Sequence, residues 1–201
     1  PIVQADNEFY LDHDYEGKYD SNGTLFLNMN NQLWPRDEVL LIHGHNMLSG
    51  AMFGRLMKYE KYDYLCKYPV VEFRTIYDDE AVYYAPISAF NASMLPYNRK
   101  YFDITQIVFD DDPDEDGTNV GEGADTADGE TVRKSTELQT YLDALQEWSL
   151  WESPVDVNVD DELLMLVTCS YYHDDGRFVL VCRKLRSDET RESVEALFTA
   201  E

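Results

Sequence analysis

The sequence predicts a mostly-β domain with a small number of helices. Its 201 residues, of which 44% are hydrophobic, are enough to form one domain with a sizeable core. Fifteen tyrosines, and short β-prone runs separated by turn residues, favour a sheet over a helical bundle. We therefore expect residues 1–201 to form a single domain.

The expected elements begin with a polar and aromatic cap. Residues 1–22 should form a short helix and loops at the N-terminus. Strands are expected at Gly23–Leu27 and Glu38–His43, on either side of a segment rich in turn residues. A hairpin is then expected between Val70–Ile76 and Ala81–Phe90.

The second half of the chain contains the clearest helix, at Lys134–Trp151. Apolar side chains recur there at spacings of three and four, which places on one face Leu138, Tyr141, Leu142, Leu145 and Trp148. A strand is expected at Val155–Val159, and the charged tail Ser187–Glu201 is expected to be helical. For Tyr101–Phe109, a helix and a strand remain equally consistent with the pattern.

A predicted hairpin near the C-terminus brings reactive side chains together. Its strands are the apolar runs Leu163–Thr168 and Phe178–Cys182, and the turn between them contains Gly176, which we expect to adopt a positive φ. Cys169 then ends one strand and Arg177 starts the next, so the two side chains are neighbours. A guanidinium that keeps its charge stabilises the nucleophilic thiolate.

A Cys–Arg pair still needs a group that carries protons. The best candidate is His45, at the end of the apolar run Val39–Ile42. Its place in a Gly-His-Asn unit, which a family resemblance given below matches, favours it over His43, and the geometry agrees because the chain can leave the strand after Gly44. His43 is interpreted instead as a strand residue satisfied by its neighbours. On the hairpin alone, Cys169 would be a buried structural cysteine; the histidine and the arginine together favour catalysis.

These segments resemble those of sortases. The cysteine and arginine strands of that family are similar to LVTCSYYHDDGRFVLVCRKL. The class B form of the histidine segment, in which Gly-His-Asn-Met precedes Gly-x-Met-Phe, is similar to LLIHGHNMLSGAMFGRL. The class B N-terminal segment is similar to PIVQADNEFYLDHDYEGKYDSNGTLFLN, so the resemblance covers nearly the whole chain apart from the acidic stretch after Phe109.

The resemblance implies a fold and an activity. The fold would be a closed β-barrel of about eight strands, with an N-terminal helical cap and a helix before the penultimate strand. The activity would be that of a cysteine transpeptidase, a type of cysteine protease. Such an enzyme cleaves a C-terminal sorting signal (LPxTG or NPxT-like) after threonine through a thioacyl intermediate, and transfers the protein to an amine of the cell wall or of a pilin.

The resemblance also implies residue roles and a location. Cys169 would be the nucleophile, His45 the general acid and base, and Arg177 the oxyanion-stabilising group, with Thr168 and Ser170 as further substrate or oxyanion residues. We expect a Gram-positive cell-surface protein, held outside the cytoplasm by an N-terminal membrane anchor that lies outside this sequence.

The net charge of −24 argues against nucleic acid as a partner and offers no basic patch for anionic lipid. No run approaches the roughly 18 apolar residues that span a bilayer. The acidic excess is greatest in Asp110–Glu130, which holds ten acidic residues and no basic one and is expected to be an exposed, mobile loop.

The acidic stretch begins like a calcium-binding loop at Asp112-x-Asp114-x-Asp116-Gly117. Gly123 stands where the loop needs a glutamate, and Glu122 is one place early. A solvated charge run is therefore favoured over calcium binding within residues 110–123, and no cofactor or metal is expected.

Two other functions remain open. A Cys–His peptidase that only hydrolyses would share the three residues, and an amine acceptor would distinguish it from a transpeptidase. A catalytically inactive surface-binding β-domain would show no special reactivity at Cys169 compared with Cys66 and Cys182, both interpreted as core cysteines.

Overall fold

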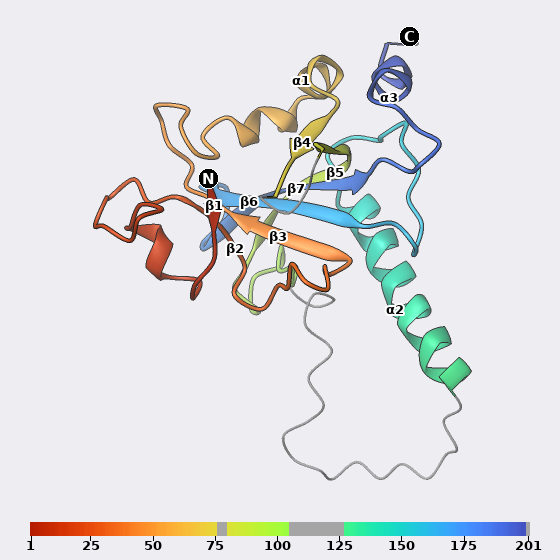
Figure 1. Ribbon diagram of the computed structural model, residues 1–201, viewed down its shortest axis with the longest axis horizontal. Coiled ribbons are helices and arrows are strands. Elements are labelled where there is room, and N and C mark those ends of the chain that lie inside the picture. Colours follow the sequence, from red (N-terminus) through yellow and green to blue (C-terminus); the bar gives the residue numbers. More distant parts are fainter. Residues whose placement is uncertain (76–79, 105–126, 200–201) are drawn as a thin grey trace.

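The computed structural model describes residues 1–75, 80–104 and 127–199, with the side chains of residues 127–136 left aside. Seven strands lie in this part of the chain, and they form one curled sheet (Figure 1). Their bounds are β1 Ile2–Val3, β2 Leu25–Leu27, β3 Val39–His43, β4 Val71–Phe73, β5 Val82–Ser93, β6 Leu163–Ser170 and β7 Gly176–Lys184. Their order across the sheet is β1-β2-β3-β6-β7-β5-β4.

The centre of the sheet is formed by β3, β6 and β7. β3 and β6 are parallel, with Val39 opposite Leu163, whereas β7 is antiparallel to both β6 and β5. Every residue of β6 from Leu163 to Thr168 is buried. Such continuous apolar runs, without alternation of polar residues, are typical of strands covered on both faces.

Helices cover the sheet. The long helix α2, Ala127–Glu147, packs on one face, where the Tyr141 hydroxyl lies 3.6 Å from the Met165 sulfur on β6 (Figure 1). A short 3-10 helix, η2 (Leu56–Glu60), packs against β5 and β7 and is followed by α1, Tyr62–Lys67. The N-terminal segment carries only one turn of 3-10 helix, η1, Phe9–Leu11.

The predicted fold class is confirmed: the molecule is mostly β, with a curled sheet and few helices. The described residues supply seven strands where about eight were expected, and β1 and β4 lie at the two edges of the sheet without pairing with each other. The predicted hairpin of β4 with β5 is formed, with Val71 opposite Tyr84.

Several boundaries differ from the prediction. The helix expected at Lys134–Trp151 starts earlier, at Ala127, and therefore includes the last residues of the stretch expected to be a loop. The rest of that stretch, residues 110–126, and most of Tyr101–Phe109 lie outside the described residues. The tail is helical as expected over α3, Arg191–Leu197.

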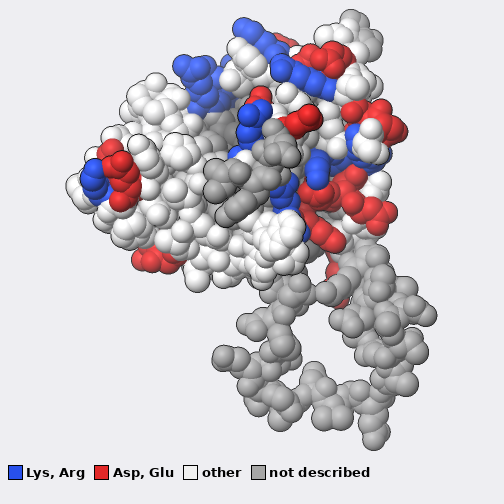
Figure 2. Space-filling model, viewed as in Figure 1, with Lys and Arg blue, Asp and Glu red and all other residues white. Residues whose placement is uncertain are grey.

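The prediction of a strand at Val155–Val159 is wrong, because this segment is irregular. The backbone of this segment hydrogen-bonds to a buried arginine instead of to another strand: the Asp156 carbonyl accepts a hydrogen bond of 3.0 Å from Nε of Arg183. Arg183 also pairs with Glu189, and Arg186 pairs with Asp161 at 2.8 Å. On the face shown in Figure 2, basic and acidic side chains accordingly intermix around α3.

Candidate active site

Cys169 and Arg177 lie opposite each other at the end of the β6–β7 hairpin. The bond of 2.9 Å from Lys184 N–H to Glu162 C=O fixes which residue pairs in this ladder are hydrogen-bonded. Counting from it in steps of two, Cys169 and Arg177 form a non-hydrogen-bonded pair, the kind in which facing side chains approach most closely. Cys169 is exposed although both of its neighbours are buried.

His45 reaches the same end of the sheet from β3. His43 pairs with Val167, and the Gly44 N–H donates a bond of 3.1 Å to the Val167 carbonyl. The Asn46 side-chain amide then donates to the Cys169 carbonyl at 3.0 Å. The residue between these two anchors is His45, so three strands bring the predicted cysteine, histidine and arginine to one end of the sheet.

The orientation of the His45 ring is set by the N-terminal cap. Nε2 lies 2.6 Å from the Leu11 carbonyl oxygen. Because a carbonyl oxygen only accepts, Nε2 carries a proton, and Nδ1 is the nitrogen that can exchange one. Gly44, before His45, is closely packed: a Cβ there would lie 2.3 Å from Leu25 Cδ2 and 2.8 Å from Phe53 Cδ2, so these side chains would have to shift.

The Arg177 guanidinium is held by its own turn. Its Nη1 donates to Asp175 Oδ1 at 2.8 Å and to the Gly176 carbonyl at 3.0 Å. The positive φ predicted for Gly176 belongs instead to Asp175, whose φ is 47°. Gly176 is required for a different reason: a Cβ there would lie 2.6 Å from the Ser170 carbonyl oxygen.

His43 lies beneath this site as a neutral ring. It stacks on Phe26, with ring centroids 5.1 Å apart, and the Asn28 side-chain amide donates to its Nε2 at 3.2 Å. Burial, and secondly the positive charge of Arg177, lower the pKa of His43 to about 4. This agrees with the prediction that His43 is a strand residue satisfied by its neighbours.

The Thr168 and Ser170 hydroxyls face the interior. Thr168 Oγ1 donates to the Gly44 carbonyl at 2.7 Å, and Ser170 Oγ donates to Asn91 Oδ1 at 2.7 Å. Ser170 is also at a hydrogen-bonded position of the β6–β7 ladder, opposite Gly176, so its N–H points toward β7. Both side chains thus contribute to positioning, and their role toward a substrate stays a prediction.

Sequence reasoning missed three residues at this site: Leu11, Asn46 and Asp175. Asn46 had a signal, because it directly follows His45 in the Gly-His-Asn-Met unit. Asp175 stands two residues before Arg177 in an acidic turn, where an ion pair could have been expected. Leu11 acts through its backbone carbonyl, which no side-chain pattern reports.

The other cysteines differ from Cys169 in exposure. Cys182 is fully buried, which raises the pKa of its thiol, and Cys66 is partly buried on α1. Among the described residues, no group of three or more His, Cys, Asp or Glu side chains is arranged to hold a metal ion. The candidate calcium segment, residues 110–123, lies outside them.

No helix in the described part of the chain combines the length and the apolar character that crossing a bilayer requires.

Comparison with known proteins identifies similar chains. The sequence is 27% identical over 183 residues to Sortase B of Listeria monocytogenes and 23% identical over 189 residues to Sortase B of Staphylococcus aureus. These alignments cover 90% and 92% of this chain but only 62% and 65% of the relatives, so the chain spans less than two thirds of their length. No family model matches the sequence.

Solved structures show the same architecture. Sortase B of Clostridium perfringens matches with a TM-score of 0.68 at 21% identity, covering 92% of this chain and 86% of that one. The Staphylococcus aureus sortase B–substrate complex matches with a TM-score of 0.68 at 23% identity, covering 94% of this chain and 74% of that one.

The curled sheet, with its cysteine and arginine strands side by side, is the sortase fold. Within that fold, the curated relatives and the structures compared are sortases of class B, and the resemblance to class B predicted from the motifs is confirmed.

Proposed function

We propose that this protein is a cysteine transpeptidase of the sortase type. The observation that carries the proposal is the pairing of exposed Cys169 with Arg177 at the end of the hairpin, with His45 anchored alongside by Gly44 and Asn46. Similarity to proteins named Sortase B supports it. Solved relatives include a sortase B–substrate complex and a sortase B complexed with triglycine, which supports a peptide donor and an amine acceptor.

The first half of the reaction cleaves the donor peptide. The Cys169 thiolate attacks the carbonyl carbon of a threonine in the sorting signal, and the Arg177 guanidinium stabilises the oxyanion that forms. His45 donates a proton to the departing amine when the C–N bond breaks. Because Nε2 is held by the Leu11 carbonyl, this proton comes from Nδ1. A thioacyl-enzyme remains.

The second half of the reaction transfers the acyl group. An amine attacks the thioacyl carbon, His45 takes up the proton that the amine loses, and the C–S bond breaks to release the Cys169 thiolate. The acceptor amine belongs to a cell-wall peptide or to a pilin lysine, and the donor carries an LPxTG or NPxT-like signal. The reaction takes place outside the cytoplasm, at the surface of a Gram-positive cell, and uses no cofactor.

Three single substitutions test the assignment: Cys169→Ala, His45→Ala and Arg177→Ala. Each is assayed with a fluorescent sorting peptide and an amine acceptor, and the ligated product is measured by mass spectrometry. Removing an oxyanion donor is expected to lower the rate by about 10²–10³, and removing the nucleophile should abolish the product. Ligation at the wild-type rate by any variant would remove that residue from the mechanism.

The two competing functions give different results in the same assay. A Cys–His peptidase would release only the hydrolysed peptide, whatever the amine concentration. A catalytically inactive β-domain would form neither product, and iodoacetamide would alkylate Cys169 no faster than Cys66. Cys169 is more exposed than Cys66, and exposure alone makes alkylation faster. The rate of Cys169 alkylation should therefore also be compared with that of the Arg177→Ala variant, where it should be lower if Arg177 stabilises the thiolate.

A further inference from the structure

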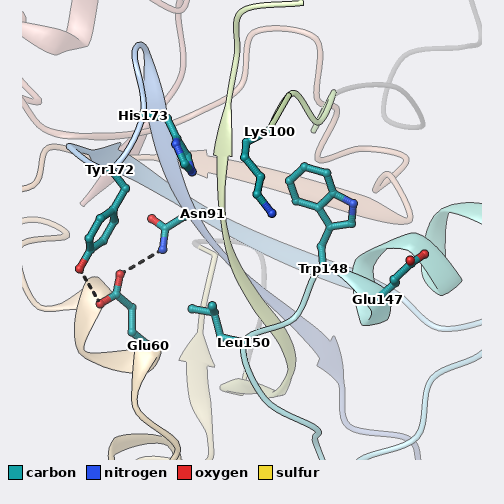
Figure 3. A pocket seen from close by; sticks show the side chains of 8 residues that line it. All are labelled: Glu60, Asn91, Lys100, Glu147, Trp148, Leu150, Tyr172 and His173. Carbon is teal, nitrogen blue, oxygen red and sulfur yellow. Dashed lines mark hydrogen bonds between the residues drawn. The ribbon is translucent and has the colours of Figure 1, made fainter. Parts of the chain in front are cut away.

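A pocket of about 710 Å³ lies at the free edge of β5, beside the turn between β6 and β7 (Figure 3). Its lining includes Tyr172 and His173 of the β6–β7 turn, which follows Cys169, but it does not include Cys169, Arg177 or His45. Its walls are formed by η2, by β5 and the segment that follows it, by the β6–β7 turn, and by the end of α2 with the residues after it. The lining residues are Glu60, Asn91, Lys100, Glu147, Trp148, Leu150, Tyr172 and His173. None of these residues has a role in the reaction proposed above.

The edge of β5 is only partly occupied. β4 pairs with it over Val82–Tyr84, although β5 continues to Ser93. Further along, the Ala89 carbonyl accepts a bond of 2.8 Å from Leu150 N–H, and Ser93 N–H donates a bond of 2.7 Å to the Lys100 carbonyl. Asn91 lies between these two occupied positions and lines the pocket.

The peptide groups of Asn91 face this gap. The bond from Met94 N–H to Asp175 C=O continues the β5–β7 ladder, and hydrogen-bonded pairs follow at every second residue from Met94. Asn91 falls between them, so its N–H and C=O point away from β7. Within the described ranges they have no backbone or side-chain partner. The pocket therefore contains one unpaired donor and one unpaired acceptor on an extended strand.

The Glu60 carboxylate in the same pocket is oriented by two neutral hydrogen-bond donors and has no basic side chain paired with it among the described residues. Glu60 Oε1 accepts from the Asn91 side-chain amide at 3.1 Å, and Oε2 accepts from the Tyr172 hydroxyl at 3.3 Å (Figure 3). No lysine or arginine pairs with Glu60 in the part of the chain that the structure describes. The ammonium of Lys100, across the pocket, lies 5.4 Å from the centre of the Trp148 ring.

We propose that this pocket binds a short extended peptide that carries a basic side chain. One residue of the peptide pairs with Asn91 in the gap between Leu150 and Lys100: its N–H donates to the Asn91 carbonyl and its carbonyl accepts from the Asn91 N–H. Its lysine or arginine side chain pairs with Glu60, which two neutral donors already hold in place. The net charge of −24 favours approach of such a cation. The proposal does not depend on the transpeptidase activity.

The first test compares two peptides on the intact protein. The probe is acetyl-Ser-Thr-Lys-Thr-Ser-amide, and its control carries norleucine in place of lysine. Binding is followed by NMR through the Asn91 backbone amide, which should shift and exchange more slowly with solvent. We expect the norleucine peptide to bind about tenfold more weakly, since it loses a charge-assisted hydrogen bond. Equal affinities, or no change at Asn91, would overturn the proposal.

The second test changes the protein and the peptide backbone. Glu60→Gln should weaken the lysine peptide about tenfold and leave the norleucine peptide unaffected, whereas Glu192→Gln, on the exposed side of α3, should change neither. The peptide nitrogens are also methylated one at a time. Binding should be lost only when the methylated nitrogen is the one that donates to the Asn91 carbonyl. Wild-type affinity in Glu60→Gln, or for every methylated peptide, would contradict the proposed site. The two-peptide comparison decides the question even if a variant fails to fold.

Discussion

At the scale of single residues, Asp175 determines where the Arg177 guanidinium lies. It adopts a φ of 47°, which aspartate tolerates better than most residues, and in this conformation its carboxylate reaches Nη1 at 2.8 Å. Both side chains are partly exposed, at 29% and 44%, so solvent screens the pair. The ion pair therefore orients Arg177 more than it stabilises the fold.

Replacing Asp175 with Asn should therefore impair catalysis more than stability. We expect kcat to fall about two- to fivefold, the range that corresponds to an exposed ion pair, with little change in KM or in melting temperature. The matched control is Asp174→Asn in the same turn, whose side chain is exposed. If the two variants have the same kcat, Asp175 does not position Arg177.

His43 provides a test of the charge beneath the site. Its pKa of about 4 lies below the ordinary value of 6.5, so between these pH values the unfolded chain binds a proton that the folded chain does not. The contribution of His43 to stability is complete above pH 6.5 and is lost, at about 1.4 kcal/mol per pH unit, as the pH falls toward 4. NMR titration should give this low pKa in the wild type and a higher one in Arg177→Gln. A His43 pKa near 6.5 in the wild type would show that the ring is not buried beside Arg177.

Residue types and their spacing identified the candidate catalytic side chains, but not the groups that hold them in place. Cys169, Arg177 and His45 could be found because the hairpin pattern and the Gly-His-Asn-Met unit are visible in the sequence. Leu11 could not be found, because its contribution is a backbone carbonyl brought to His45 by the packing of the cap. The wrong assignment of positive φ to Gly176 has a related cause, since the close approach of the Ser170 carbonyl is a tertiary contact.

At the scale of elements, the β6–β7 turn depends on a residue without a side chain. A Cβ on Gly176 would approach backbone oxygens of Ser170 and His173 at 2.6 and 2.8 Å, and backbone atoms cannot move aside as a flexible side chain can. Gly176→Ala should therefore destabilise the protein by about 2 kcal/mol or more, and it should also displace Arg177. Chemical denaturation measures the change. Asp174→Ala, in the same turn, is the control and should cost less than about 0.5 kcal/mol.

The segment that follows β7 is held by a buried charge. Arg183 is fully buried and makes two hydrogen bonds to Glu189, while hydrogen bonding from Arg183 lowers the pKa of Glu189. Glu189→Gln would leave the buried guanidinium with only the more distant Asp156 carboxylate, 3.8 Å from Nη2, and we expect it to cost about 3–5 kcal/mol in denaturant unfolding. Glu192→Gln serves as the exposed control and should be neutral. A loss below about 1 kcal/mol for Glu189→Gln would mean that Arg183 is compensated by other groups.

Element boundaries were less predictable than element types. The strands of the central sheet follow from continuous apolar runs and α2 follows from apolar periodicity, and local sequence determines both patterns. The segment Val155–Val159 has the alternation of a strand, but its backbone is engaged by Arg183 from β7, a contact between residues distant in the sequence. No local pattern could have shown that competition.

At the scale of the whole molecule, the acidic excess sets the response to salt. The chain has forty acidic and sixteen basic residues, so like charges repel one another. Folding brings these charges closer together and increases the repulsion. Ion pairs such as those around α3 offset only part of it. The melting temperature should rise between about 20 and 300 mM NaCl, because salt screens this repulsion. A melting temperature that falls with salt would show that the surface ion pairs outweigh the net charge.

In the proposed reaction, the Cys169 thiol, paired with Arg177 and assisted by His45, forms a covalent acyl intermediate. Intact-protein and peptide mass spectrometry, after incubation with a panel of sorting peptides and no added amine, measures that intermediate directly. We expect an adduct on Cys169 with the mass of the donor peptide up to its threonine; when an amine is added, the adduct should disappear and a ligated product should be released. An adduct on Cys66, or turnover of a sorting peptide by the Cys169→Ala variant, would contradict it.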